Sequence, residues 1–185
     1  DELMQAFREF KAAWDPAKRM NPGKIVDPFR VDEHLRLGPQ YRPIEVKTHL
    51  AFVTKEGDGF LRAVGHCVGM GKCRASKGGT MCPSYRVTRD EQHLTRGRAN
   101  TLRLALSGQL GADAFTGEAM HETMDLCVGC KGCKRDCPTG VDMAKMKIEF
   151  LHHWQRARGL AFKDRAVASL PRWAPWAARV PWLAN

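Results

Sequence analysis

The sequence predicts a mainly α-helical fold with long loops, an N-terminal helix on an extended arm, and a tail rich in Pro and Trp. Three observations support this expectation. Apolar residues recur at helical spacing in several short segments, loops rich in Gly and Lys lie between these segments, and seven Cys fall into two groups. Branched apolar residues are few, so the core is thin, and the Cys are the residues able to reinforce it.

Composition narrows the class of protein. The 185 residues suffice for one or two small domains, and 30 Lys and Arg against 20 Asp and Glu give a formal net charge of +10. Seven Cys are too few for a disulfide scaffold, and an odd number fits paired bridges badly. No apolar stretch approaches the roughly 20 residues that span a bilayer, and no secretory signal opens the chain. We therefore expect no transmembrane segment, and a location in the cytoplasm or at the inner membrane surface.

The N-terminal part of the chain predicts one helix and an arm. Residues 3–14 carry large apolar side chains at helical spacing, and residues 31–57 are rich in Pro and charge with no sustained period. The helical stripe comprises Leu3, Phe7, Phe10 and Trp14. We read residues 31–57 as a linker or an extended arm. Because the chain begins at Asp1 rather than with Met, we expect it to be part of a longer protein.

Three further helices are expected around the two groups of Cys. Residues 58–66 lead into the first group, and residues 67–82 are loop apart from their Cys. Residues 96–110 form a helix with Thr95 as a candidate N-cap. Residues 117–126 form another helix, which delivers the chain to the second group of Cys.

The clearest helix in the sequence covers residues 141–157, with Gly159 suited to the position just after its end. The stripe expected to face the core comprises Val141, Ala144, Ile148, Leu151 and Trp154. A last short helix is expected at residues 162–170. The tail beyond it alternates Pro with Trp173, Trp176 and Trp182, and is either a strap over this domain or a docking surface.

The strongest motif is the run from Cys127 to Pro138, which reads C-V-G-C-K-G-C-K-R-D-C-P. Its spacing, C-x2-C-x2-C-x3-C-P, is the one that bacterial two-cluster ferredoxins use, in which the fourth Cys binds the other cluster. Three thiolates, each separated from the next by two residues on a Gly-containing loop, can bind three corners of an iron–sulfur cube. Structural zinc usually takes two ligands from one place and two from well away, so this run favours a cluster.

The earlier Cys follow the same template with one change. Cys67, Met70 and Cys73 occupy the first three positions, and Cys82-Pro83 matches the closing Cys-Pro after an insertion. Crossed ligation then predicts two sites. A complete [4Fe–4S] cluster is expected at Cys82, Cys127, Cys130 and Cys133, and a second site with three thiolates is expected at Cys67, Cys73 and Cys137.

The occupant of the second site stays open at this point. The site could hold a three-iron cluster, or a four-iron cluster closed by water, by His66 or by another donor. It could equally be empty, with its Cys packed as small buried hydrophobes. A thioether is a soft ligand, but we do not expect Met70 to bind cluster iron.

Several residues near the Cys have two readings each. Arg96 and Arg98 brace a cluster loop or pair with Asp and Glu, and Asp136 and Asp142 are expected to cap helix starts. Basic residues among the Cys either tune the cluster or form a solvated face. These are Lys72, Arg74, Lys77, Lys131, Lys134 and Arg135. Ser84 and Tyr85 either donate hydrogen bonds to cluster sulfur or pack without such a role. His152 and His153 are expected to be ordinary residues at the boundary between core and surface.

The sequence around these residues resembles a known family. The segments C-V-G-M-G-K-C-R, G-T-M-C-P-S-Y-R, H-L-T-R-G-R-A-N and L-C-V-G-C-K-G-C-K-R-D-C-P-T-G-V-D resemble the fused FAD-linked oxidases and iron–sulfur oxidoreductases, which include bacterial D-2-hydroxyglutarate dehydrogenases. The resemblance implies that residues 1–30 end an FAD-linked oxidase domain and that residues 58–160 form an alpha-helical ferredoxin domain. It implies that residues 161–185 lead to a Cys-rich domain.

This resemblance implies an electron-transfer role. The flavin part of such enzymes takes a hydride equivalent from a 2-hydroxy acid such as D-2-hydroxyglutarate, D-lactate or glycolate, and a segment like this one carries electrons away singly. It would be part of a larger FAD-linked oxidoreductase acting on a CH–OH group, with FAD and the substrate site upstream of Asp1. The partners implied are the FAD-linked oxidase and Cys-rich domains of the same polypeptide and an electron acceptor, with homo-oligomerisation open. In the glycolate oxidase type a Cys stands at the position of Met70.

Two other classes of function also fit parts of the sequence. A zinc-binding basic module for nucleic acid suits the charge of +10, but the basic residues are scattered and no finger spacing is present, so we expect no nucleic-acid partner. A cluster that serves only as a structural staple also fits the Cys pattern. A redox titration separates a staple from an electron carrier.

Overall fold

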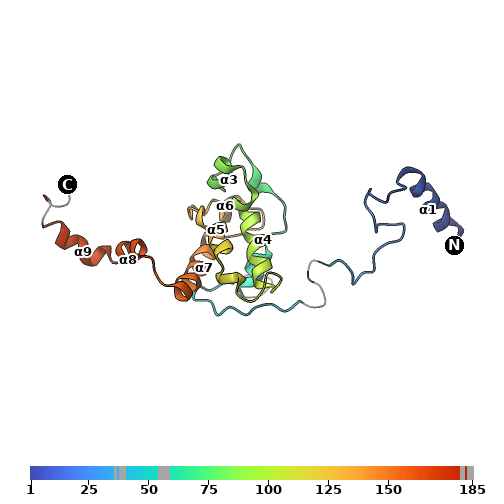
Figure 1. The fold of residues 1–185 in the computed structure, drawn as a ribbon. Helices are drawn as coiled ribbons and strands as arrows, with labels where there is room; N and C mark the ends of the chain where they lie inside the picture. Colours follow the sequence, from blue (N-terminus) through green and yellow to red (C-terminus); the bar gives the residue numbers. More distant parts are fainter. Residues whose placement is uncertain (36, 38–40, 54–58, 180–181, 183–185) are drawn as a thin grey trace. The chain divides into compact units, whose positions relative to one another are not determined.

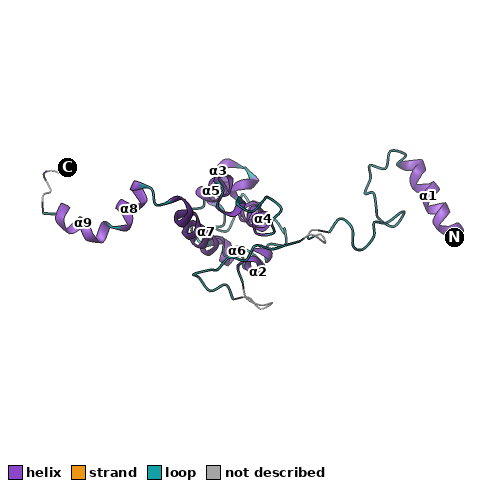
Figure 2. Ribbon diagram, turned by 60° about the horizontal axis from the view of Figure 1, so that its bottom comes forward, coloured by secondary structure: helices purple, strands orange, loops and turns teal. Residues whose placement is uncertain are grey.

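The computed structural model describes most of the chain, namely residues 1–35, 37, 41–53, 59–179 and 182. Every regular element among them is helical, which confirms the predicted mainly α fold (Figures 1 and 2). None of these described helices is long and apolar enough to cross a membrane. The remaining positions of the predicted arm (36, 38–40 and 54–57), of the tail (180–181 and 183–185) and the predicted helix start at 58 lie outside the described residues.

The chain divides into two units, residues 1–41 and residues 42–185. The first unit contains α1 (Glu2–Trp14), as predicted, and its whole apolar stripe is exposed. Asp15 ends this helix: its buried carboxylate accepts hydrogen bonds from the backbone N–H groups of Arg19 (2.7 Å) and Met20 (2.9 Å) and pairs with Lys11 Nζ at 3.0 Å. The turn after α1 is therefore fixed by a single side chain.

The second unit contains the helices that position the cysteines. In chain order its elements are α2 (Phe60–Gly65), the 3-10 helix η1 (Lys72–Arg74), α3 (Pro83–Thr88), the 3-10 helix η2 (Glu91–His93), α4 (Thr95–Leu106), the 3-10 helix η3 (Ala114–Thr116), α5 (Glu118–Asp125), α6 (Gly132–Asp136), α7 (Met143–Arg158), α8 (Phe162–Ala168) and α9 (Leu170–Ala177). Five of them, α2, α4, α5, α7 and α8, confirm predicted helices, whereas α3, α6 and α9 were not predicted.

The helix α9 forms in the Pro- and Trp-rich tail. Pro171 lies in its first turn, where a missing N–H costs nothing, and Pro175 lies inside it. Trp173 Nε1 donates a hydrogen bond to the carbonyl of Ala166 at 2.8 Å, yet the ring of Trp173 is 45% exposed and that of Trp176 is 68% exposed. A strap that covers the domain would bury these rings, so the exposure speaks against that reading of the tail.

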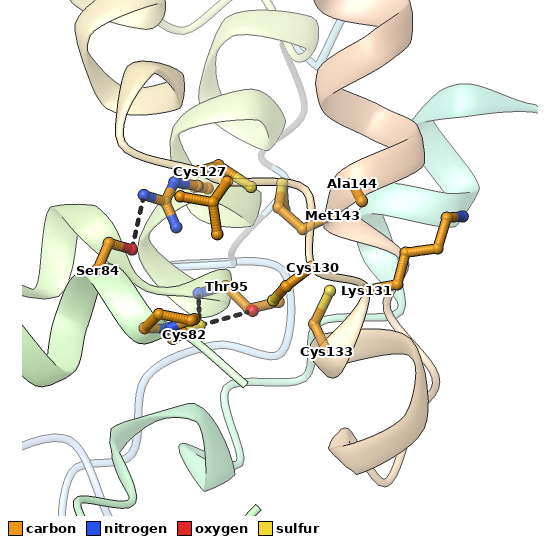
Figure 3. A pocket seen from close by; sticks show the side chains of 12 residues that line it. Cys82, Ser84, Thr95, Cys127, Cys130, Lys131, Cys133, Met143 and Ala144 are labelled. Atoms are coloured by element: carbon orange, nitrogen blue, oxygen red, sulfur yellow. Dashed lines mark hydrogen bonds between the residues drawn. The ribbon is translucent and has the colours of Figure 1, made fainter. Parts of the chain in front are cut away.

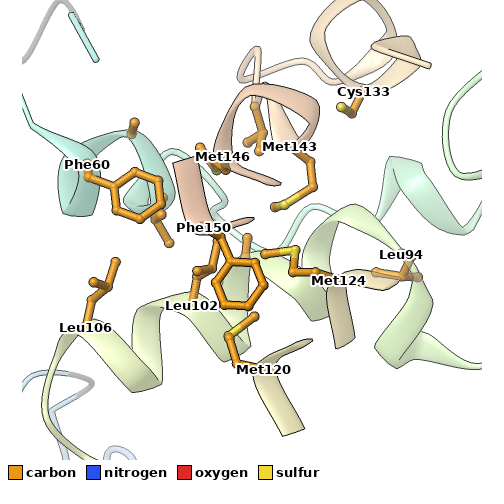
Figure 4. Packing of buried hydrophobic residues seen from close by; sticks show 14 of the residues in the cluster. Phe60, Leu94, Leu102, Leu106, Met120, Met124, Cys133, Met143, Met146 and Phe150 are labelled. Carbon is orange, nitrogen blue, oxygen red and sulfur yellow. The ribbon is translucent and has the colours of Figure 1, made fainter. Parts of the chain in front are cut away.

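The core is built around α4, which contacts α2, α5 and α7 (Figure 4). The buried apolar residues of α7 are Met143, Ala144, Met146 and Phe150, so the predicted burial of Ala144 is confirmed. Ile148 is 56% exposed, so its predicted inclusion in the core stripe is wrong. Met143, Met146 and Phe150 share one buried cluster with large residues of the neighbouring helices, among them Leu102, Leu106, Met120 and Met124. Flexible thioether side chains adapt to irregular gaps, which suits a core formed between short helices.

A buried carboxylate on α7 fastens the arm that enters the second unit. Glu149 is 1% exposed and accepts hydrogen bonds from the backbone N–H groups of His49 (3.0 Å) and Leu50 (2.9 Å). The ring of His153 contacts the same carboxylate at 3.0 Å. Burial alone would raise the pKa of Glu149, but the hydrogen bonds from His49, Leu50 and His153 lower it below its ordinary value. The ionised carboxylate therefore stabilises the folded state.

We expect Glu149→Gln to lower the free energy of unfolding by about 1–3 kcal/mol, because the neutral amide cannot accept all three hydrogen bonds that the buried carboxylate accepts. Urea unfolding measures this change, and Glu122→Gln, at an exposed position of α5, is the matched control. A depressed carboxyl pKa stabilises above the unfolded pKa, so native stability should fall as the pH drops below about 4.3. The variant should lose less over that range, and parallel pH profiles for the two proteins would contradict the assignment.

Candidate iron–sulfur site

Four cysteines from two distant segments line one pocket (Figure 3). Cys127 and Cys130 come from the loop between α5 and α6, Cys133 lies in the first turn of α6, and Cys82 directly precedes α3. The pocket encloses a space of about 310 Å³, part of it open to solvent. Cys82 and Cys133 are buried, whereas Cys130 is exposed. These are the four residues predicted to hold the complete cluster.

The other three cysteines line a second pocket, whose space of about 300 Å³ is partly open to solvent. Cys67 and Cys73 come from the first motif and Cys137 from the second, so the crossing of the two motifs is present here too. Met70 lies on the rim of this pocket and is 64% exposed. The structure thus gathers the same two sets of cysteines that crossed ligation predicts, while ligation itself stays a prediction.

The chemistry of the two sets fits iron–sulfur clusters. All seven cysteines are free, and thiolates are the usual ligands of such clusters. No group of three or more His, Cys, Asp or Glu side chains in the described part of the chain is spaced to hold a single metal ion.

The two cysteine loops share one backbone course. Gly69 and Gly129, each two residues after the first Cys of its motif, have φ values of 78° and 65°. Two positions further, Gly71 and Lys131 have φ values of 80° and 56°. Lys131 is thus a side-chain-bearing residue in the left-handed region, which Gly adopts without strain. The repeated C-V-G of the sequence marks this repeat.

Gly132, the residue after Lys131, is required by a close contact between two backbone segments. A Cβ atom on Gly132 would lie 2.9 Å from the backbone nitrogen and 3.0 Å from the Cα of Met81. The backbone just before Cys82 therefore packs directly on the first turn of α6, and only Gly leaves room for it. This contact brings Cys82 to the other three cysteines.

Asp136 holds the same two segments together. Its carboxylate accepts hydrogen bonds from the backbone N–H groups of Thr80 and Met81, the latter at 3.1 Å. The bond from Thr80 and the neighbouring Arg135 guanidinium keep the pKa of Asp136 below its ordinary value. The prediction that Asp136 caps a helix start is wrong, because it is the last residue of α6 and binds a loop over 50 residues away in sequence.

Carboxylates near the cysteines cap one helix and pair with several of the neighbouring basic residues. Asp142 caps α7 as predicted, accepting a hydrogen bond from the backbone N–H of Lys145 at 3.0 Å. The same carboxylate lies 3.1 Å from Lys131 Nζ and 3.8 Å from Lys134 Nζ. Arg135 and Arg74 also pair with carboxylates. Much of the positive charge among the cysteines is therefore neutralised locally.

The sulfur of Cys82 receives two contacts from Thr95. The backbone N–H of Thr95 donates to Cys82 Sγ at 3.1 Å, and Thr95 Oγ1 lies 3.0 Å from the same sulfur (Figure 3). The prediction that Thr95 caps its helix is wrong, because Leu94 is the N-cap and Thr95 is the first helical residue. Hydrogen bonds of this kind stabilise a thiolate.

The remaining thiols differ in environment. Burial raises the pKa of Cys73 and Cys133. Burial acts in the same direction on Cys137, but hydrogen bonds from Thr139, at 3.2 Å through its hydroxyl, and from nearby backbone N–H groups lower its pKa.

Two arginines of the T-R-G-R-A-N segment are placed differently. Arg98 is 2% exposed and lines the four-cysteine pocket, where its Nε donates to the carbonyl of Thr123 at 3.0 Å and its Nη2 donates to Ser84 Oγ at 3.1 Å. Arg96 lines the other pocket and pairs with Glu91. Of the two roles considered from the sequence, bracing of a loop suits Arg98, and pairing with a carboxylate suits Arg96. Tyr85, close to Ser84, is buried as a packed ring.

The cation of Lys147 was not singled out in the sequence, yet it touches the cysteine loop. Its Nζ donates to the backbone carbonyls of Cys127 (2.7 Å) and Asp125 (2.9 Å). Burial lowers the pKa of Lys147, and the charges of Cys127 and Asp125 oppose that shift. Lys147 lies twenty residues after Cys127 on α7, and that spacing is the one sequence feature that relates it to the cysteine loop.

Comparison with known proteins agrees with this geometry. Residues 62–141, which include all seven cysteines, match the 4Fe-4S dicluster domain family. The chain is similar over 100% of its length to D-2-hydroxyglutarate dehydrogenase of Pseudomonas putida, at 28% identity, and over 98% to that of Escherichia coli, at 27% identity. The glycolate oxidase iron-sulfur subunit of E. coli is 35% identical over 86 residues, which are 46% of this chain and 18% of that protein. The expected resemblance to FAD-linked oxidases and iron–sulfur oxidoreductases is confirmed.

The chain spans about a fifth of the length of the dehydrogenases that it matches, 21% in both cases. No solved structure matches it significantly.

We expect Gly132→Ala to destabilise the chain by about 1–3 kcal/mol, because its methyl group meets backbone atoms that cannot turn aside. Urea unfolding measures the loss. Gly65→Ala is the control: Gly65 ends α2, and a Cβ there meets nothing within 4 Å, so it should be neutral or slightly stabilising. Equal stability of the two variants would show that the contact between Met81 and α6 is unimportant.

Proposed function

We propose that this chain is the iron–sulfur electron-transfer segment of a larger FAD-dependent dehydrogenase of 2-hydroxy acids. The observation that carries the proposal is the convergence of Cys82 with Cys127, Cys130 and Cys133 around one pocket. The similarity to D-2-hydroxyglutarate dehydrogenases along the whole chain supports the substrate class. Their greater length supports a flavin-binding part and further domains on the same polypeptide.

In this proposal the chain's own residues hold the redox centre and bias its charge. When bound, a [4Fe–4S] cluster accepts and releases single electrons, which suits transfer away from a two-electron flavin. The four thiolates of the first pocket would hold it. The N–H of Thr95 faces Cys82 Sγ, and the guanidinium of Arg98 lines the pocket, so both stabilise negative charge there.

The second pocket is proposed as a site of its own with three thiolates, from Cys67, Cys73 and Cys137. The dicluster character of the matched family supports an occupied second site. The exposed Met70 stands where the first pocket has Cys130, so a three-iron cluster, or a four-iron cluster with a non-Cys ligand, fits this donor set. The division into an oxidase end at residues 1–30, a ferredoxin domain at 58–160 and a link at 161–185 is part of the same proposal.

Iron and acid-labile sulfide analysis of anaerobically prepared protein tests the proposal. About four irons per chain indicate one cluster, and about seven or eight indicate two. Zinc without sulfide would reject the cluster and favour the zinc-binding alternative. A cluster that cannot be reduced by dithionite would instead indicate a structural staple.

The assignment to two sites is tested with one cysteine from each pocket. Cys130→Ser should abolish the visible and EPR signals of the complete cluster, because it removes one of its four thiolates. Cys67→Ser should leave that cluster in place and affect the second site only. The same loss of iron and of EPR signal in both variants would contradict crossed ligation.

A further inference from the structure

We propose that Arg98 is a positioning residue of the four-cysteine site, which braces the two segments that supply the thiolates and raises the reduction potential of the cluster they hold. This inference rests on the proposed function, because it needs a cluster in that pocket.

Arg98 is buried, and no carboxylate of the described residues forms an ion pair with it. Its guanidinium lies almost wholly inside the protein, and its hydrogen-bond partners, the carbonyl of Thr123 and the hydroxyl of Ser84, are neutral. Among the described residues no carboxylate forms an ion pair with it. A buried cation is costly unless an anion lies nearby. A structure that keeps this charge inside therefore calls for a counter-charge.

The cysteines of the pocket are the groups that provide it. Burial lowers the pKa of Arg98, and negative charge on Cys127, Cys82 and Cys133 acts most strongly against that shift. Four thiolates around a cluster form a net anion, and one-electron reduction adds one more negative charge. A fixed cation beside the pocket favours the reduced form and so raises the potential.

The two hydrogen bonds of Arg98 connect the segments that supply the cysteines of the pocket. Ser84 lies on α3, two residues after Cys82, and Thr123 lies on α5, four residues before Cys127. The dashed line from Ser84 in Figure 3 marks one of the two bonds. The forked guanidinium thus joins the elements that carry Cys82 and Cys127. Ser84 is held in turn, because its hydroxyl donates to the carbonyl of His93 at 2.6 Å.

Arg96 shows what a different arginine of the same helix does. It lies two residues earlier on α4, lines the other pocket, and is paired with Glu91. Its charge is already neutralised by that carboxylate, so its removal should change the field at the four-cysteine pocket little. Arg96→Met is therefore the matched control for Arg98→Met.

The test uses the full chain with iron and sulfide restored anaerobically. A redox titration follows the EPR signal that Cys130→Ser abolishes, with iron, sulfide and far-UV circular dichroism measured for each protein. At fixed potential the oxidised-to-reduced ratio should rise about tenfold in Arg98→Met, a shift of about 59 mV to lower potential for one electron. Arg98→Lys should keep most of the native potential but bind less cluster, because a single ammonium cannot reach both Ser84 and Thr123.

The outcomes separate this inference from the proposed function. An unmodified chain that binds no iron and sulfide counts against the proposed function, before any variant is compared. If Arg98→Met is loaded and titrates like the native chain, or if Arg98→Lys shifts as far as Arg98→Met, the role of the charge is overturned. If Arg98→Met is helical but cannot be loaded while Arg98→Lys can, the cation is required for the site and the inference is supported. An equal shift in Arg96→Met would show that the effect is not specific to Arg98.

Discussion

The structure depends on one close contact, between the backbone before Cys82 and the first turn of α6. Gly132 allows this approach, and the Asp136 carboxylate fixes it by binding the N–H groups of Thr80 and Met81. Without it, the loop of residues 74–81 would leave Cys82 free of the second motif. The pocket of four cysteines is therefore a tertiary feature, made by two segments that each contribute an incomplete set.

The rest of the fold serves to hold these loops with little hydrophobic material. The helices are short, and short helices are marginal on their own, so their stability comes from packing. The centre is filled by the thioether side chains of Met120, Met124, Met143 and Met146. Around them, the ring of Phe115 makes edge-to-face contacts with Phe60 and Phe150, at centroid distances of 6.0 Å and 5.9 Å. Buried polar groups such as Glu149 and Arg98 then tie loops to helices. Much of the specificity of this small core thus comes from polar anchors.

The parts that the sequence predicted are those that local patterns encode. The spacing of the cysteines and the period of α1, α4, α5 and α7 are visible within a few residues, and these predictions of class and of helices are confirmed. Helices of five or six residues such as α3 and α6 are too short for a period to show. The partners of Asp136 and Glu149 lie 55 and 100 residues away, so no local pattern indicates them. Ile148 was assigned to the core because it falls on the apolar stripe of its helix, but it is exposed, whereas Met146 and Phe150 are buried.

The two cysteine pockets share a backbone design but differ in their charges and donors. The loops after α2 and α5 pass through the same left-handed positions, yet one presents Met70 where the other presents Cys130. The arginine beside the three-cysteine pocket is neutralised by Glu91, whereas the arginine beside the four-cysteine pocket is buried with neutral partners. A site with more thiolates carries more negative charge, and it is this site that has the unneutralised cation. The two pockets therefore share a loop geometry but differ in their number of cysteines and in the partner of the neighbouring arginine.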